Sequence, residues 1–271
     1  MPSGKKSKQM RQAARTAPPP VRAKGAPRQR QASPRVLIGA GAVVLAIVIA
    51  IVLAVVFSGG SSNPATNTPA IGSITNGLPG AAGVESLFKG IPQSPTTLGR
   101  ASAPVTMIEY IDLQCPACRE FATKVFPKVV TRFVRTGKLK IVMRPWAFIG
   151  PDSVRGQAAV LAAGEQNRAF NYAELLYDNQ GTENTGWLDD AMVAAAAASI
   201  PGLPVHKLLT AVTSASVKAQ ARNVDALAKA DKVNHTPAIY VSQSGTHGAE
   251  LALKSPTDEA TLVHAIQAAL A

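Results

Sequence analysis

The sequence predicts an α/β domain with a helical insertion, preceded by a single transmembrane helix. Residues 36–57 are apolar and carry no charge, which is typical of a membrane span. Residues 104–126 have the pattern of a strand, a tight turn and a helix. Residues 152–232 are rich in alanine, have helical periodicity and lie between strand-like segments. This helical stretch is longer than a simple crossover between two strands needs.

The N-terminal segment is strongly basic. Residues 1–35 hold ten of the 28 lysines and arginines and no aspartate or glutamate. They account for most of the formal net charge of +12, so the high pI says little about the folded part. The composition predicts a disordered cytoplasmic tail. Because these charges precede an apolar run, we interpret them as a topology signal and expect no nucleic-acid binding.

The apolar run is long enough to cross a bilayer as one helix, which rises about 1.5 Å per residue. A signal-peptide core is shorter, about 7–15 residues, although residues 58–61 leave cleavage open as an alternative. The positive-inside rule places the N-terminus in the cytoplasm and the rest outside, anchored at the cell membrane. Residues 58–84, rich in Gly, Ser, Asn, Thr and Pro, predict a flexible linker.

Residues 85–271 predict one domain that is large enough for its own core. We expect an edge strand near residues 87–91 and central strands at 104–113 and 138–149. The insertion is predicted at about 152–232. Its expected helices are 153–166, 168–178, 188–199, 205–213 and 216–232, followed by strands at 237–242 and 248–253 and a closing helix at 256–271.

Cys115 and Cys118 are the only cysteines in the chain. They lie in a Cys-Pro-Ala-Cys sequence where the strand meets the helix, with Pro116 at the first helical position. Cys115 takes the N-cap position, where free N–H groups and the helix dipole stabilise a thiolate. We expect Cys115 to be accessible with a low pKa, and Cys118 to be shielded and able to close a disulfide with it. The spacing favours redox chemistry.

The cysteine pair has three alternative interpretations. A structural zinc site needs about four ligands, but the chain has two cysteines, and its four histidines lack the spacing of a zinc site. The second alternative is two unrelated buried cysteines, which their close spacing after a strand disfavours. The third is a structural disulfide, which would close only a short loop and so would contribute little stability. We therefore expect no metal and no bound cofactor, only a redox-active Cys115–Cys118 disulfide.

Two segments resemble a known family. The strand–CPAC–helix unit, with Glu109 six residues before Cys115, resembles the thioredoxin fold, and ASAPVTMIEYIDLQCPAC resembles its DsbA-like branch of thiol:disulfide oxidoreductases. Residues 233–241, VNHTPAIYV, resemble the cis-proline segment of the family. The resemblance covers roughly 85–271. It implies that Pro237 is cis and that the backbone of Thr236 pairs with an extended substrate beside the thiols.

Glu109 is unusual in an apolar strand. One interpretation is an exposed strand face, since strands alternate their faces. The other follows from the resemblance, which implies a buried acid that moves protons to and from the buried cysteine. Arg144 is a candidate partner of Glu109, although an exposed arginine at a strand end is the simpler interpretation.

Three residues are expected to modulate the thiols. Strongly oxidising members of the family have Pro-His between the cysteines, whereas this chain has Pro116 and Ala117. A histidine there favours the thiolate, so Ala117 predicts a milder oxidant. His235 precedes Pro237 by two residues and is a candidate to perturb the pKa of Cys115 or to contact substrate. The alternative is a loop histidine that faces solvent.

The resemblance implies an extracytoplasmic enzyme that forms disulfides in exported proteins. It also implies a membrane redox partner that restores the disulfide, either DsbB-like or vitamin K epoxide reductase-like. In an oxidising compartment, a domain whose two cysteines form one Cys-x-x-C pair is more consistent with a catalytic dithiol than with structural disulfides. The alternatives are a disulfide reductase or isomerase on the same fold, and a non-catalytic, membrane-tethered binding protein.

Overall fold

The computed structural model describes residues 68–271. The predicted tail (1–35), the predicted span (36–57) and most of the predicted linker lie outside the described residues. Within the described part, none of the helices combines the length and the apolar content that a bilayer crossing needs.

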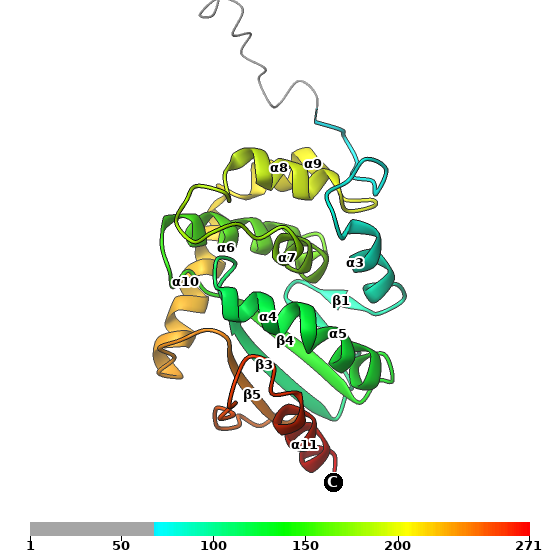
Figure 1. The fold of residues 1–271 in the computed structure, drawn as a ribbon, viewed down its shortest axis with the longest axis vertical. Coiled ribbons are helices and arrows are strands. Elements are labelled where there is room, and N and C mark those ends of the chain that lie inside the picture. Colours follow the sequence, from blue (N-terminus) through cyan, green and yellow to red (C-terminus); the bar gives the residue numbers. More distant parts are fainter. Residues whose placement is uncertain (1–67) are drawn as a thin grey trace, which may run out of the picture. The chain divides into compact units, whose positions relative to one another are not determined.

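The centre of the described domain is a five-stranded mixed sheet with the order β1-β2-β4-β3-β5 (Figure 1). The central strands β3 and β4 are parallel, and β5 pairs with β3 in the antiparallel direction. The expected central strands are therefore confirmed. The strands are β1 (Gln93–Ser94), β2 (Thr97–Leu98), β3 (Val105–Ile111), β4 (Leu139–Pro145) and β5 (Ala238–Gln243).

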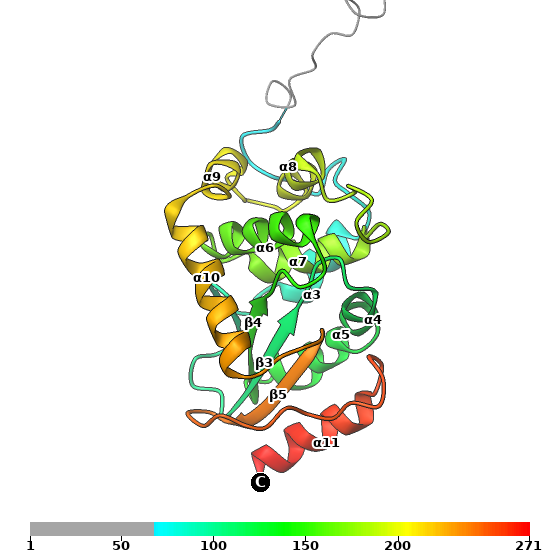
Figure 2. The same cartoon turned by 90° about the vertical axis from the view of Figure 1, so that its left-hand side faces the viewer.

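Helices cover both faces of this sheet. Figure 2 shows α10 on one side of the strands and α4, α5 and α11 on the other, with α6 and α7 beyond the ends of β3 and β4. Tyr110 of β3 packs with Ala228 of α10 in a small apolar cluster, whereas Met107 and Ile111 belong to the main core that includes Cys118. Because side chains alternate along a strand, Glu109 faces the main core.

The five predicted helices of the insertion are present within a few residues of the expected bounds. Side-chain caps fix two starts: Asp189 accepts from the Met192 amide, and Ser214 accepts from the Val217 amide. The insertion comprises α6 (Pro151–Gly164), α7 (Ala169–Asp178), α8 (Asp190–Ala198), α9 (Val205–Ala211) and α10 (Ala215–Ala230), and α11 (Glu259–Leu270) closes the chain.

The helix after the cysteines is broken near Pro127. It consists of α4 (Pro116–Lys124), α5 (Phe126–Val129) and a π-helical turn (Val130–Val134), as expected where a proline removes a donor from a helix. Phe126 stacks on Phe170 of α7, with ring centroids 6.2 Å apart and planes 13° from parallel. This contact joins the thiol-bearing helix to the insertion.

Two expectations are wrong. We expected a linker that ends at residue 84 and an edge strand near residues 87–91. The structure has helix α3 (Ala81–Phe88) there instead, because Ala81, Val84 and Phe88 lie at helical spacing and bury one face. The chain already joins the domain before this helix, since the Gly72 amide donates to the Leu203 carbonyl. Residues 248–253 form no full strand; they make an isolated bridge between Tyr240 and Glu250.

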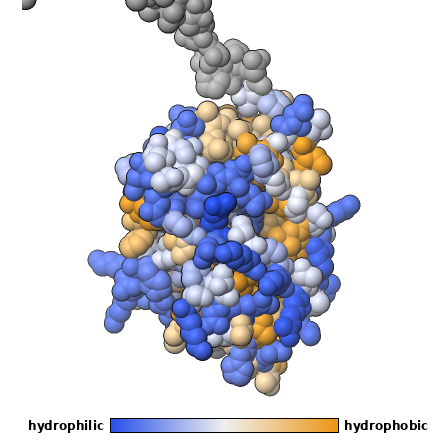
Figure 3. All heavy atoms as spheres, viewed as in Figure 1, coloured by the Kyte–Doolittle hydropathy of each residue, from blue (hydrophilic) through white to orange (hydrophobic). Residues whose placement is uncertain are grey.

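The surface on one side of the described domain is mostly polar. On the side shown in Figure 3, hydrophilic side chains predominate and apolar ones gather only in small patches. Scattered apolar residues of this kind are normal on protein surfaces.

Candidate active site

The two thiols lie where β3 gives way to α4. Cys115 is the N-cap of α4, Pro116 follows at the start of the helix, and the Cys118 amide donates to the Cys115 sulfur at 3.4 Å. The predicted N-cap position is therefore confirmed. Both cysteines are free thiols. Cys118 is 1% exposed, as predicted, but Cys115 is only 7% exposed and so is less accessible than expected.

The groups around the two thiols shift their pKa values in opposite directions. The pKa of Cys115 is lowered to about 6, mainly by a hydrogen bond from the Cys118 thiol. Burial acts in the opposite direction and raises the pKa. The Thr236 side chain and the amides of Cys118 and Ala117 are further donors that lower it. The pKa of Cys118 is raised well above its usual range, first by burial and then by its neighbour Cys115. At neutral pH, these opposite shifts favour a thiolate at Cys115 and a protonated thiol at Cys118.

The loop before β5 covers the thiols. The Thr236–Pro237 peptide is cis, as predicted, and the Cys115 thiol donates to the Thr236 carbonyl at 3.3 Å. Beside this contact lies a cavity of about 470 Å³, lined by Ala117, Pro237, Leu251 and other residues of the same loops. The site thus combines a reactive sulfur with a partly apolar groove.

His235 lines this groove, and neither of its ring nitrogens contacts a thiol. Its Nδ1 lies 3.0 Å from the Asn234 side-chain oxygen, and its Nε2 lies 3.0 Å from a Glu250 carboxylate oxygen. The side chain is 54% exposed. Both ring nitrogens are engaged, so the geometry fits the loop-histidine interpretation better than a direct contact with Cys115.

Glu109 is buried rather than on an exposed face. It is 2% exposed, and burial raises its pKa to about 8. The suggested pairing with Arg144 is wrong: the Arg144 guanidinium contacts Asp231 at 2.8 Å and the Tyr110 hydroxyl. Arg144 lies opposite Tyr110 in the β3–β4 register. It therefore lies on the α10 side of the sheet, and Glu109 on the other.

Residues 92–262 match the family described as Thioredoxin. The match agrees with the structure, in which a Cys-x-x-C turn lies beside a loop with a cis-proline. The chain belongs to this thioredoxin family.

Two relatives of the chain carry names that refer to disulfide bond formation. The thioredoxin-family chain is 28% identical over 149 residues to the Bacillus cereus "Probable disulfide bond formation protein D", covering 54% of this chain and 69% of that one. It is 26% identical over 150 residues to the Bacillus subtilis "Disulfide bond formation protein D", covering 54% and 66%. Within the family, the chain is a thiol:disulfide oxidoreductase.

Solved structures show the same fold, helical insertion included. Oxidised BdbD from Bacillus subtilis superposes with a TM-score of 0.58 at 22% identity, covering 74% of this chain and 99% of that one. Chlamydia trachomatis DsbA superposes with a TM-score of 0.55 at 21% identity, covering 64% and 90%. The thioredoxin-family protein therefore has a DsbA-like fold.

A buried polar network holds the turn that carries the thiols, and sequence analysis did not identify it. The Asp112 carboxylate accepts from the amides of Gln114, Phe148 and Ile149, each at 2.8 Å. Gln180, from the loop after α7, donates to the Cys115 carbonyl at 3.1 Å. These bonds fix the start of α4 in this thioredoxin-family protein. The sequence signal was the polar pair Asp112 and Gln114 inside an otherwise apolar stretch.

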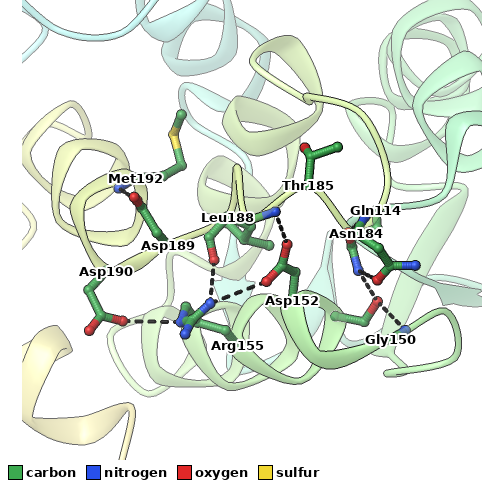
Figure 4. A network of polar contacts seen from close by, with 12 residues as sticks. Gln114, Gly150, Asp152, Arg155, Asn184, Thr185, Leu188, Asp189, Asp190 and Met192 are labelled. Carbon is green, nitrogen blue, oxygen red and sulfur yellow. Dashed lines mark hydrogen bonds and ion pairs between the residues drawn. The ribbon is translucent and has the colours of Figure 1, made fainter.

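The same network fastens the loop between α7 and α8. Figure 4 shows Asp152 and Arg155 of α6 pointing toward this loop. Asp152 accepts from the Gly186 amide at 3.0 Å, and Arg155 donates to the Leu188 carbonyl at 2.9 Å. The Gln114 side chain lies beside Asn184 of the loop. The insertion thus supports one side of the site. Among residues 68–271, no cluster of three or more histidine, cysteine or acidic side chains could hold a metal ion.

Proposed function

We propose that the protein forms disulfides in exported proteins, through the Cys115–Cys118 pair, on the outer side of a cell membrane. In this proposal residues 36–57 span the membrane and residues 1–35 stay in the cytoplasm. The observation that carries the proposal is the opposite shift of the two thiols, with the pKa of Cys115 lowered to about 6 and that of Cys118 raised. A stabilised Cys115 thiolate favours the reduced form, which makes the disulfide form an oxidant.

The reaction transfers two electrons from substrate to enzyme. A substrate thiolate attacks the Cys115 sulfur, the Cys115–Cys118 bond breaks, and Cys118 takes the electron pair and a proton. A second substrate thiolate then attacks the substrate sulfur of the mixed disulfide, and Cys115 leaves as a thiolate. A low pKa makes Cys115 a good leaving group. The dithiol needs no bound cofactor, and a membrane oxidase of the DsbB-like or vitamin K epoxide reductase-like kind returns it to the disulfide.

The groove beside the thiols supports a protein substrate. Its lining includes Thr236, Pro237 and the apolar side chains of Leu251 and Leu253. An extended chain laid there brings its own backbone to the loop that carries Thr236, which is the geometry of strand addition. We expect substrates to be unfolded, thiol-bearing segments rather than small molecules.

The test is the redox state of the thiols in intact cells that express the full-length chain. Cells are quenched with acid, and free thiols are alkylated with a reagent that adds mass. We expect mostly the Cys115–Cys118 disulfide at steady state, and after reduction we expect labelling of Cys115 by a reagent that does not cross membranes. A mostly reduced pair would point to a reductase or isomerase instead. Failure of the impermeant label would contradict the proposed location.

Replacing Ala117 with histidine is expected to make the protein a stronger oxidant. Ala117 follows Pro116 at the N-terminus of α4 and donates its amide to the Cys115 thiolate. An imidazolium at this position lowers the pKa of Cys115 further. Each 1.4 kcal/mol of added preference for the reduced form raises the reduction potential by about 30 mV. Titration in glutathione buffers and thiolate absorbance give both quantities. Ala117→Gln is the control for size, and an unchanged potential in Ala117→His would contradict the prediction.

A further inference from the structure

Cys118 has to gain or lose a proton in each exchange although it is buried. It is 1% exposed, and burial raises its pKa well above the usual range. A thiolate leaving at this position therefore takes a proton at once, and the proton comes from inside the protein. Bulk water does not reach the sulfur directly, so a route for protons has to exist.

Glu109 lies on the Cys118 side of the sheet but does not reach solvent. It is 2% exposed, and its pKa of about 8 means that it carries a proton at neutral pH. Once it has given this proton to Cys118, it has to be protonated again through other groups. The structure therefore needs a second group between Glu109 and the surface.

Glu174 of α7 occupies such a position. It is 8% exposed, and its pKa is raised first by burial and then by the charges of Glu109 and Asp178. Tyr177, one turn away on α7, is buried among the same groups, and its pKa is raised by burial and by the charges of Cys118 and Glu174. Helix α7 packs against α4, the helix that carries Cys118, so its buried acid lies near enough to the thiol and to Glu109 for their charges to interact.

A cavity connects this acid with the outside. It has a volume of about 480 Å³, and its lining includes Glu174, Asp178, Val84 of α3 and Ala122 of α4. Ala122 lies one turn after Cys118, and its small side chain leaves this space open. Asp178 follows Glu174 by one turn of α7 and is exposed to solvent. A cavity of this size, lined by carboxyl groups, can hold several water molecules.

We propose that Glu109, Glu174 and Asp178 form a proton route between Cys118 and the cavity bounded by α3, α4 and α7. The inference rests on the proposed exchange at Cys115 and Cys118. The step in which Glu109 gives its proton to the departing Cys118 thiolate is the one that the family resemblance implies. The new part is that Glu174 then returns a proton to Glu109, and that Asp178 with the cavity water returns one to Glu174. In the opposite direction the same groups accept the proton of Cys118. Glu174 does not touch the reacting sulfur atoms. It acts only by exchanging a proton with Glu109.

The charges around Glu174 are compatible with this role. Within the described residues, no basic side chain forms an ion pair with it. On α3, Glu85 is held by the Asn171 side chain at 3.1 Å. Desolvation raises the pKa of Asp178, and the charge of Arg119 on α4 opposes this shift. Arg135 lines the cavity, and its guanidinium donates to the carbonyls of Leu87 and Lys89. An unpaired buried acid keeps its proton available for transfer.

The experiment measures how fast a dithiol reduces the oxidised, full-length chain across a range of pH. Dithiothreitol attacks Cys115, so Cys118 leaves and takes a proton in the measured step. General acid catalysis contributes about 10²–10⁴-fold, and we expect Glu174→Gln to slow the reduction by about tenfold or more and to change the pH profile. Asp178→Asn, at the rim, is expected to have a smaller effect in the same direction. Glu120→Gln, which removes an exposed acid of α4 paired with Lys124, is the matched control and should react like the wild type.

A second measurement separates proton transfer from a structural role. In Glu174→Ala the cavity is enlarged, and added acetate is expected to restore the rate in proportion to its concentration, whereas chloride at equal ionic strength should not. If Glu174→Gln and Glu174→Ala react like the wild type, or if acetate does not restore a slowed Glu174→Ala, the inference is overturned. If the wild type itself is not reduced by dithiothreitol, the proposed function fails instead.

Discussion

Replacing Cys118 with serine is expected to abolish turnover and to leave the protein covalently bound to its substrates. Cys115 keeps its N-cap position. The serine hydroxyl can donate to the Cys115 thiolate in place of the Cys118 thiol, and the amides at 117 and 118 and the side chain of Thr236 remain as donors. The Cys115 thiolate attacks a disulfide of a substrate, one substrate sulfur leaves as a thiolate, and Cys115 forms a mixed disulfide with the other. In the wild type Cys118 attacks this bond and releases the substrate; the variant lacks that sulfur, so the mixed disulfide accumulates. Non-reducing gels of cells that express the variant should show adducts that collapse on reduction.

Cys115→Ser is the matched control for this trap. It leaves only the buried Cys118, which is 1% exposed and has a raised pKa. A protonated, shielded thiol reacts slowly, so this variant should be equally inactive but free of adducts. Adducts with Cys115→Ser alone would mean that the two cysteines have the opposite roles.

Replacing Glu109 with glutamine is expected to stabilise the fold at alkaline pH and to slow catalysis. The pKa of Glu109 is raised from 4.5 to about 8 by burial. The folded state thus holds a proton that the unfolded state loses, and stability falls as pH rises from about 4.5 to about 8. The shift of about 3.5 pKa units corresponds to a penalty of up to about 5 kcal/mol above pH 8. Glutamine carries no such penalty.

The measurement is the free energy of unfolding of the full-length chain in denaturant at several pH values, followed by the fluorescence of Trp146 and Trp187. Glu109→Gln should gain stability over the wild type at pH 8, and the difference should shrink toward zero below pH 4.5. Glu120→Gln, at an exposed position paired with Lys124, should show neither change. A difference that is independent of pH would mean that Glu109 is not protonated by burial in the fold.

Several features of the site were predictable from the sequence because they depend on residues close together in the chain. The N-cap position of Cys115 requires only a strand, a proline and a helix in succession. The shielding of Cys118 follows from one further turn of the same helix. The cis peptide before Pro237 and the burial of Glu109 came from the resemblance to the family, and the structure agrees with both.

Short segments without strong periodicity were harder to predict. Residues 87–91 are apolar enough for a strand, but they follow Ala81 and Val84, whose spacing with Phe88 makes one helical face. A short apolar run does not separate a strand from the end of a helix. The segment at 248–253 lies along β5 but makes only one bridge to it, because pairing depends on its tertiary neighbours rather than on its own residues.

The sequence by itself determined the chemistry of the protein: a Cys-Pro-Ala-Cys pair at a helix start, a cis-proline loop and an acid in the central strand. Only the tertiary structure decided which groups surround them. Arg144 joins Asp231 instead of Glu109 because the strand register places it on the opposite face. Gln180 donates to the Cys115 carbonyl, and the charge of Glu109 acts on the pKa of Glu174, only because the insertion folds back over the thiols. Such contacts depend on packing between distant segments, and no local pattern of residues encodes them.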